Sequence, residues 1–376
     1  MEVKTYNIFV DAHVFDGEFQ GTLTYIKELY GEFLKKNNNA TIYFGANKPE
    51  NVKKHFYEFK NAVYIKYKSK TSSKRIFFEI PKIIDNLRCS HAHFQYIIPF
   101  RKNKKCNYIV TIHDILFNDF PKEFSILYRL KRNLLFYLSA KRCDYLLTVS
   151  NYSKQKISKQ YNIEKNKIIV TPNAVSYHFF QFKSSKENSR KYIAINKNIE
   201  KYILYVSRIE PRKNQILILK AFIEKKIWKK GFSLVFIGSN TLNIGFQNII
   251  NNSSKEQKKS IYWIEQVNTK DLMHFLNGAE FFVYPSKAEG FGIPPLEAGA
   301  LCTPVLCSNN TAMADFDFFQ PYLFDADNYN NFLLMLMTFI DNYKTIDVHA
   351  MQSKIKNRYS WSETFRIFNT NIFING

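Results

Sequence analysis

Two acidic residues, Glu289 and Glu297, form the feature of this sequence with the clearest chemical meaning. They stand eight positions apart in the segment Glu280–Ser308, EFFVYPSKAEGFGIPPLEAGALCTPVLCS. Gly290 and Gly292 lie between them and allow the backbone to come close to a ligand. Because carboxylates accept hydrogen bonds, two of them at one pocket would suit the hydroxyl groups of a sugar or a ribose. Taken alone, the pair could equally be two surface acids around a turn.

The same segment predicts a strand that leads through a loop into a helix. Pro294 and Pro295 stand where the helix would begin, since proline fits the first turn. The amide groups of Phe291, Gly292 and Ile293 would then point out of the helix N-terminus, an arrangement that favours phosphate. This turn is therefore a candidate for phosphate binding.

A basic pair, Arg208 and Lys213, follows a second predicted strand at Tyr202–Val206. It precedes a helix that Asn214 could cap. Two fixed cations at the end of a strand could hold the diphosphate of a nucleotide and stabilise the charge that develops as it leaves. Arg212 lies between them and could substitute for one of them. Basic residues near a turn can also simply be solvated.

Short runs of β-branched and aromatic residues recur along the chain, apolar on both faces, as in a parallel sheet covered on both sides. In the first half they fall at 6–12, 41–46, 62–67, 108–114, 145–150 and 167–171. In the second half they fall at 202–206, 233–238, 261–267, 280–285 and 304–308. Helical stretches between them include 21–36, 151–161, 214–226, 269–278, 294–302 and 328–343. The pattern predicts an α/β protein with two doubly wound, Rossmann-like domains that face a central cleft.

The polar stretch 178–200 has no convincing periodicity and is the expected linker between the domains. We expect an N-terminal domain over 1–177, a C-terminal domain over 201–356, and a last helix over about 357–376 that packs back on the first. Ligands of open α/β sheets bind outside the carboxyl ends of the strands, so function should lie in those loops.

The segment 280–308 resembles the donor-site motif of the retaining glycosyltransferases of family 4, of the bacterial polysaccharide and O-antigen type. The motif of these two-domain, GT-B enzymes is a pair of Glu eight apart around a Gly-Phe-Gly-x-Pro core. The resemblance extends to 11–30, 91–99, 110–114, 149–153, 170–175, 202–222 and 233–238. It thins at 48–90, 176–200 and 310–350. It implies transfer of a sugar from a nucleotide diphosphate to an acceptor hydroxyl, with no cofactor besides this nucleotide-sugar substrate.

The resemblance also implies roles for single residues. The catalytic set would be Arg208, Lys213, Glu289 and His113, and the donor-binding set Gly21, Gly238, Phe291, Gly292, Ile293 and Glu297. Glu289 would hold hydroxyls of the donor sugar and Glu297 the ribose. His113 would contact the donor sugar, and Gly21 would let the loop after the first strand approach it.

No metal site is expected. Asp325 and Asp327 copy the Asp-x-Asp of another glycosyltransferase fold, but they follow a late strand of the second domain. His91 and His93 alternate on a strand and have no third ligand nearby in sequence, so we expect that strand to line the acceptor side.

The net charge is +22, and residues 1–175 hold 30 Lys and Arg against 15 Asp and Glu, an excess of 15. A biased genome composition could explain this, as could an anionic membrane or a phosphate-bearing partner. No nucleic-acid motif is present, so nucleic acid is not an expected partner. In Lys122–Arg142 an apolar stripe lies beside basic residues, as in a helix at a membrane interface or a helix that faces a core. The expected stripe is Phe124, Leu127, Tyr128, Leu134, Leu135 and Leu138.

The sequence predicts a cytoplasmic enzyme, peripheral on the inner face of the cytoplasmic membrane. The five cysteines are scattered, and no window holds the ~18 apolar residues of a membrane span. We expect transfer of a hexose or deoxyhexose, mannose-like by preference, to a saccharide acceptor, lipid-linked, in surface polysaccharide synthesis. Two alternatives stay open: a nucleotide-sugar epimerase of the same fold, and a noncatalytic protein that binds nucleotide sugars or membranes.

Overall fold

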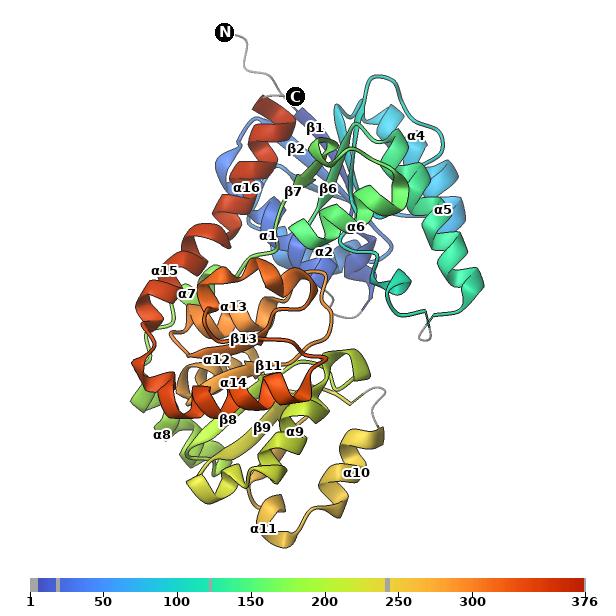
Figure 1. The fold of residues 1–376 in the computed structure, drawn as a ribbon. Helices are drawn as coiled ribbons and strands as arrows, with labels where there is room; N and C mark the ends of the chain where they lie inside the picture. Colours follow the sequence, from blue (N-terminus) through green and yellow to red (C-terminus); the bar gives the residue numbers. More distant parts are fainter. Residues whose placement is uncertain (1–5, 18–20, 122–123, 241–243, 375–376) are drawn as a thin grey trace. The chain divides into compact units, whose positions relative to one another are not determined.

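The computed structural model describes residues 6–17, 21–121, 124–240 and 244–374 (Figure 1). The chain forms two compact units. The first unit runs up to Asn173 and also contains the chain from Trp361 onward, and the second unit is Ala174–Ser360. Each unit is built on one sheet whose paired strands are all parallel, so the predicted α/β class with two Rossmann-like halves is confirmed.

The sheet of the first unit has seven strands in the order β3-β2-β1-β4-β5-β6-β7. In the register of the central pairs, Ile8 lies opposite Ile42 and Val10 opposite His93. The strands are β1 (Tyr6–Asp11), β2 (Ala40–Ala46), β3 (Ala62–Lys66), β4 (His91–Gln95), β5 (Asn107–Thr111), β6 (Tyr145–Thr148) and β7 (Ile168–Val170).

The helices of the first unit cover this sheet. They are α1 (Gly21–Lys36), α2 (Pro49–Phe56), α3 (Ser72–Lys74), α4 (Ile80–Asn86), α5 (Ile126–Arg142), α6 (Asn151–Tyr161) and α16 (Trp361–Asn369). Helix α1 buries Ile26, Leu29 and Phe33, which recur at three- and four-residue steps, the period of one helix face. The predicted helices 21–36 and 151–161 are thus confirmed. No helix in the described ranges is long and apolar enough to cross a membrane.

The sheet of the second unit has six strands in the order β10-β9-β8-β11-β12-β13. The strands are β8 (Tyr202–Val206), β9 (Ser233–Ile237), β10 (Ile261–Ile264), β11 (Phe281–Tyr284), β12 (Val305–Ser308) and β13 (Leu323–Phe324). The helices are α7 (Tyr177–Phe180), α8 (Lys186–Lys197), α9 (Gln215–Glu224), α10 (Ile244–Asn252), α11 (Lys255–Lys258), α12 (Thr269–Gly278), α13 (Ile293–Ala300), α14 (Tyr329–Asn342) and α15 (Val348–Arg358).

Both strand orders reverse direction once along the sheet. The reversal falls between β1 and β4 in the first unit and between β8 and β11 in the second. At such a switch point the loops after the two central strands leave toward opposite faces of the sheet, which opens a crevice for ligands at their carboxyl ends. The loops that carry the predicted site residues of the second unit follow β8 and β11.

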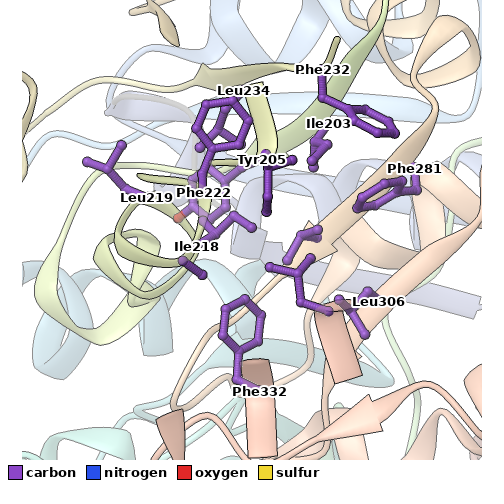
Figure 2. Close-up of a cluster of buried hydrophobic side chains, with 14 of the residues drawn as sticks. Ile203, Tyr205, Ile218, Leu219, Phe222, Phe232, Leu234, Phe281, Leu306 and Phe332 are labelled. Carbon is purple, nitrogen blue, oxygen red and sulfur yellow. The ribbon is translucent and has the colours of Figure 1, made fainter. Parts of the chain in front are cut away.

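A core of large apolar side chains fixes these two strands (Figure 2). Ile203 and Tyr205 of β8 and Phe281 of β11 meet Phe222 of α9 and Phe332 of α14, and all five are fully buried. Each such side chain contributes about 1.5–3 kcal/mol when it leaves water. The strand ends are therefore rigid supports for the loops that follow them.

The expected linker 178–200 contains helix α8. Its N-cap Ser185 accepts a hydrogen bond from the amide of Asn188 at 3.1 Å. The helix packs on α12 through polar contacts: Ser189 Oγ lies 3.1 Å from His274 Nδ1, and Tyr192 Oη donates to Asp271 at 2.8 Å. Because polar pairs replace an apolar stripe here, hydrophobic periodicity gives no signal for this helix.

The C-terminal helix α16 lies beside α1 in the first unit (Figure 1). Thr364 Oγ1 donates to the carbonyl of Pro172 at 2.8 Å, and the rings of Phe365 and Phe33 are 5.9 Å apart. The chain therefore returns to its first unit after completing the second.

Candidate active site

The loop after β8 presents the two predicted cations in different environments. The side chain of Arg208 is 64% exposed, and its nearest acid is Glu210 at 4.0 Å. Lys213 is buried at the end of a short turn, Pro211–Lys213. Asn214, predicted to cap the following helix, makes no such cap: its φ is +53°, and its side chain donates to the carbonyl of Ala326 at 3.0 Å. The asparagine therefore ties the loop after β8 to the segment after β13.

The loop after β11 brings Glu289 against Lys213. The Lys213 ammonium lies 2.6 Å from Glu289 Oε1, and the hydroxyls of Tyr284 and Ser286 donate to the same oxygen at 2.8 and 2.7 Å. Arg212 Nη1 donates to the other oxygen at 3.2 Å. Two predicted catalytic residues, 76 positions apart in the chain, are thus in direct contact.

The charges of this cluster are mutually dependent. Burial by itself would raise the pKa of Glu289, but Lys213 and Arg212 outweigh it and hold the pKa at about 2. Burial lowers the pKa of the Lys213 ammonium and nearby Arg212 lowers it further, while Glu289 opposes both. At neutral pH Glu289 is therefore a carboxylate shared between two cations.

Arg212 connects the loop after β8 to the loop after β11 by hydrogen bonds. Its guanidinium donates to the carbonyl of Ala288, to Glu289 and, at 2.7 Å, to Glu210. The side chain is only 17% exposed, against 64% for Arg208. Arg208 is therefore the more accessible arginine of the loop, whereas Arg212 is engaged within the protein.

Helix α13 begins at the phosphate-binding turn predicted from the sequence. Gly292 precedes it with φ +96°, and a Cβ there would lie 3.2 Å from Met313 Sδ, so glycine is required. Within the described ranges, the amides of Phe291, Gly292 and Ile293 donate to no other group. The ring of Phe291 is buried against Phe316 and Tyr359, so only its main chain is available to a ligand. The helix N-terminus thus presents free donors to an anion.

Glu297 lies on α13 in a quite different state from Glu289. It is half-buried, and it forms no hydrogen bond or ion pair with any other described residue. Desolvation raises the pKa of its carboxyl group to about 7. Its oxygens are therefore free to accept hydrogen bonds from a ligand.

Close packing explains why position 238 holds a glycine. It follows β9 with φ +146°, and a Cβ on it would lie 2.0 Å from the carbonyl oxygen of Ser207. The indole of Trp263 donates to the Gly238 carbonyl at 2.9 Å. Glycine at this position lets the loop after β9 approach the loop that carries Arg208.

Two predicted residues belong to the first unit. His113 follows β5 and is buried; its Nε2 lies 2.7 Å from Gln95 Oε1, so Nε2 carries the proton in this arrangement. Desolvation lowers the pKa of His113 to about 3, which keeps the ring neutral. Gly21 opens α1, is exposed, and a Cβ there would meet nothing within 4 Å, so a ligand could approach its backbone. Residues 18–20 of the same loop lie outside the described ranges.

Sequence reasoning missed three residues of these clusters: Tyr284, Ser286 and Gln95. Tyr284 and Ser286 flank the proline at the end of β11, and Gln95 ends β4. Polar side chains at the carboxyl ends of buried strands were the signal that could have found them.

The residues that we did not expect to bind a metal make contacts with other side chains. Asp327 pairs with Lys287 at 3.0 Å, and Asp325 accepts a hydrogen bond from the amide of Asp327 at 2.9 Å. His93 is fully buried between Tyr30 Oη at 3.0 Å and Thr111 Oγ1 at 2.8 Å. His93 therefore has no exposed surface, and the expectation that its strand lines the acceptor side stays a prediction. No group of three His, Cys, Asp or Glu residues in the described ranges is placed to hold a metal ion.

Family models match both parts of the chain. The model "Glycosyltransferase Family 4" matches residues 19–179, and "Glycosyl transferases group 1" matches residues 185–345. Together with the architecture of the two units, these matches indicate the GT-B fold and make both parts of the chain similar to glycosyltransferases.

Curated relatives include two mannosyltransferases. The O-antigen chain mannosyltransferase RfbU of Salmonella typhimurium is 33% identical over 225 residues, which cover 59% of this chain and 56% of the relative. The O-antigen chain mannosyltransferase B of Escherichia coli is 30% identical over 174 residues, 45% of this chain and 44% of the relative. The chain therefore spans about half the length of the curated relatives it matches.

Solved structures share the fold over nearly the whole chain. A glycosyltransferase from Rickettsia africae has a TM-score of 0.73 at 17% identity and 99% coverage of both chains. HepE of Anabaena, solved with UDP and glucose, has a TM-score of 0.70 at 12% identity and covers 98% of this chain and 99% of its own. At these identities the likeness shows the fold alone.

Proposed function

We propose that this protein is a retaining glycosyltransferase that moves a mannose-like hexose or deoxyhexose from a nucleotide-diphosphate sugar to a saccharide acceptor. The observation that carries the proposal is the cluster at the switch point of the second unit, where Lys213 and Glu289 meet beside the exposed Arg208. The preference for mannose rests on the two O-antigen mannosyltransferases among the relatives.

The nucleotide diphosphate is the leaving group of this reaction, and its developing charge is what the enzyme must stabilise. Negative charge grows on its phosphate oxygens as the bond to the sugar breaks. Arg208 and Lys213 supply fixed positive charge, and the free amides at the start of α13 add hydrogen-bond donors. Since Lys213 is buried, its charge acts in a medium of low dielectric and is worth more than in water.

The carboxylates of Glu289 and Glu297 have different roles. Glu289 keeps Lys213 oriented and accepts hydrogen bonds from the donor sugar, and Glu297, whose oxygens have no partner in the described ranges, accepts them from the ribose. His113 and Gly21 act at the transferred sugar. The neutral ring of His113 suits a contact with a hydroxyl group.

Retention of the anomeric configuration does not require a nucleophilic residue of the enzyme in this proposal. A loose, oxocarbenium-like centre with a well-stabilised leaving group allows the acceptor to attack from the side that the diphosphate leaves. The positive charges come from side chains, so no divalent metal is needed.

The acceptor is a lipid-linked saccharide of surface polysaccharide synthesis, and the enzyme works on the inner face of the cytoplasmic membrane. The basic excess of residues 1–175 supports this placement, because the inner leaflet is anionic.

The test is transfer by the purified full chain. Thermal unfolding with GDP, UDP, ADP and dTDP first identifies the base, since a ligand at 100 times its Kd stabilises by about 2.7 kcal/mol. The matching sugar nucleotide is then incubated with a lipid-linked acceptor, and the anomeric configuration of the product is read by NMR. A retained configuration is expected. An epimer formed without acceptor would instead identify an epimerase, and binding without turnover a noncatalytic protein.

A further inference from the structure

Helix α5 of the first unit turns a row of large apolar side chains toward solvent. Six of the exposed large apolar side chains in the described ranges lie on this one helix: Ile126, Leu127, Tyr128, Leu130, Leu134 and Tyr137. Leu127 is 77% exposed and Ile126 is 72% exposed. Single exposed apolar residues are normal on a soluble protein, but a contiguous row marks an interaction surface.

The row lies on the face of α5 that points away from the core. Leu127, Leu130, Leu134 and Tyr137 follow one another at steps of three and four residues, which places them on one side of a helix. The buried residues Phe136, Ser139 and Ala140 lie on the other side. Figure 1 shows the helix at the edge of its unit. We name Ile126, Leu127, Leu130, Leu134 and Tyr137 the outer stripe.

The outer stripe differs from the stripe expected from the sequence. Phe124 and Leu135, expected in it, pack instead against the core of the first unit, and Leu138 is half-buried. Ile126, Leu130 and Tyr137, which were not expected in the stripe, are exposed. Lys122 and Glu123, at the start of the expected segment, lie outside the described ranges. The alternative of a core-facing stripe is wrong for Leu127, Tyr128 and Leu134, which are exposed, and holds for Phe124 and Leu135.

The helix that carries the outer stripe is positively charged. The helix ILYRLKRNLLFYLSAKR holds five basic residues and no acid. Lys131 and Lys141 are exposed. The Arg132 guanidinium lies 4.8 Å from the ring centroid of Tyr128, and Arg142 lies 5.9 Å from that of Phe100, itself 45% exposed. Apolar groups that enter an interface beside cations held at its rim are the features of a surface that meets anionic headgroups.

We propose that the outer stripe of α5 and its basic rim dock the first unit on an anionic lipid bilayer. The apolar side chains enter the boundary between headgroups and acyl chains, and the cations meet the lipid phosphates. A second copy of the chain fits this surface poorly, because it would place five cations against five like charges. The inference rests on the proposed function only for its purpose, which is to bring the enzyme to a lipid-linked acceptor.

The experiment is sedimentation of the full chain with vesicles of phosphatidylcholine, alone or mixed with phosphatidylglycerol, over a series of salt concentrations and without any sugar nucleotide. Wild type should bind only the anionic vesicles and leave them as salt rises. Leu127→Ser with Leu134→Ser should weaken binding at least about tenfold, because two inserted side chains are lost. Lys131→Glu should weaken it at low salt.

Matched controls come from the second unit. Ile195 and Leu334 are 83% and 65% exposed, so Ile195→Ser with Leu334→Ser changes apolarity equally, and Lys220→Glu changes charge equally. These variants should bind vesicles as wild type does. The α5 variants should keep wild-type thermal unfolding and nucleotide binding, which separates this surface from the donor site.

Three outcomes would overturn the proposal. The first is equal binding to neutral and anionic vesicles, and the second is binding that the α5 variants and the controls change alike. The third is a dimer in solution that the α5 variants dissociate while vesicles bind no wild-type protein, since the partner would then be a second chain. Failure of sugar transfer with intact vesicle binding would leave this proposal standing and refute only the proposed function.

Discussion

At the scale of single residues, the two glutamates of the motif have the same chemistry and opposite environments. Glu289 accepts hydrogen bonds from four side chains, those of Lys213, Arg212, Tyr284 and Ser286. Glu297 has no such partner in the described ranges. Their pKa values, about 2 and about 7, follow from this difference. Glu289 is therefore held by four protein donors, only one of which reaches Oε2, whereas both oxygens of Glu297 remain available to a ligand.

Lys213→Ala should lower turnover at least about a hundredfold, because it removes a charge that acts on the leaving group in the transition state. The measurement is the steady-state rate with saturating donor, with Lys220→Ala on the exposed face of α9 as the control. Near-normal turnover in the folded variant would contradict the role of Lys213.

Glu289→Gln should reduce stability as well as turnover, with binding of the donor largely kept. Two buried cations lose their counter-ion, which typically costs about 3 kcal/mol. Because its pKa is lowered from the ordinary 4.5 to about 2, Glu289 stabilises the fold above pH 4.5 and loses this effect as pH falls toward 2. Thermal unfolding across that range should show a smaller loss on acidification in the variant. Glu265→Gln, at an exposed acid of the same unit, should behave as wild type.

Glu297 should make donor binding depend on pH. Its pKa is raised to about 7, so at pH 6 most of the carboxyl is protonated and cannot accept from both ribose hydroxyls. Affinity for an intact sugar nucleotide, whose diphosphate does not titrate in this range, should rise about tenfold from pH 6 to pH 8. Isothermal titration of Glu297→Gln should give weaker binding with no such rise. A variant that kept the wild-type pH profile would remove Glu297 from the site.

At the scale of elements, the loops after the central strands form one packed structure. Asn214 joins the loop after β8 to the segment after β13, Arg212 joins it to the loop after β11, and Gly238 lets the loop after β9 come against it. The position of Arg208 is thus set by three neighbouring loops rather than by its own turn alone.

Gly238→Ala should therefore disturb donor binding from a distance. The new Cβ would lie 2.0 Å from the Ser207 carbonyl, at a φ of +146° that side chains avoid, so the loop with Arg208 must move. We expect a loss of about 2 kcal/mol in stability together with weaker nucleotide binding. Gly231→Ala is the matched control, because its φ is +79° with nothing within 4 Å, so it adds strain without a clash. Equal effects of the two substitutions would show that the loop contact is unimportant.

The sequence predicted the helices and strands that are marked by a pattern of apolar residues. Apart from β4 and β13, the strands of both sheets fall within a few residues of their predicted ranges, and helix 269–278 matches α12. The elements that the predictions omitted include α8 and α15, which bury few apolar residues, and β13, which has two residues. For the site, the positions after two predicted strands and the resemblance to family 4 predicted that the basic pair and the glutamates serve one donor, and the structure brings Lys213 and Glu289 into contact. The sequence could not predict the partners Tyr284 and Ser286, because these depend on how two loops pack.

At the scale of the whole molecule, the distribution of charge separates two tasks. In the second unit the cation that we propose as catalytic and that is buried, Lys213, is held by a specific partner, Glu289. The excess charge of the chain lies instead in residues 1–175, where α5 carries five basic residues and no acid. We assign the first kind of charge to the leaving group and the second to the membrane.

Catalysis by the whole molecule should need no divalent metal, because the proposed function assigns the stabilisation of the leaving group to Arg208, Lys213 and the amides at the start of α13. In the described ranges no three His, Cys, Asp or Glu residues gather to hold an ion, and the Asp-x-Asp is engaged: Asp327 pairs with Lys287. Turnover measured with and without a chelator should therefore agree within about twofold, well below the hundredfold scale of a lost transition-state charge. Asp327→Asn should likewise leave turnover unchanged. Activity that the chelator abolishes and that magnesium or manganese restores would refute this assignment and transfer the stabilisation of the leaving group from side chains to a bound ion.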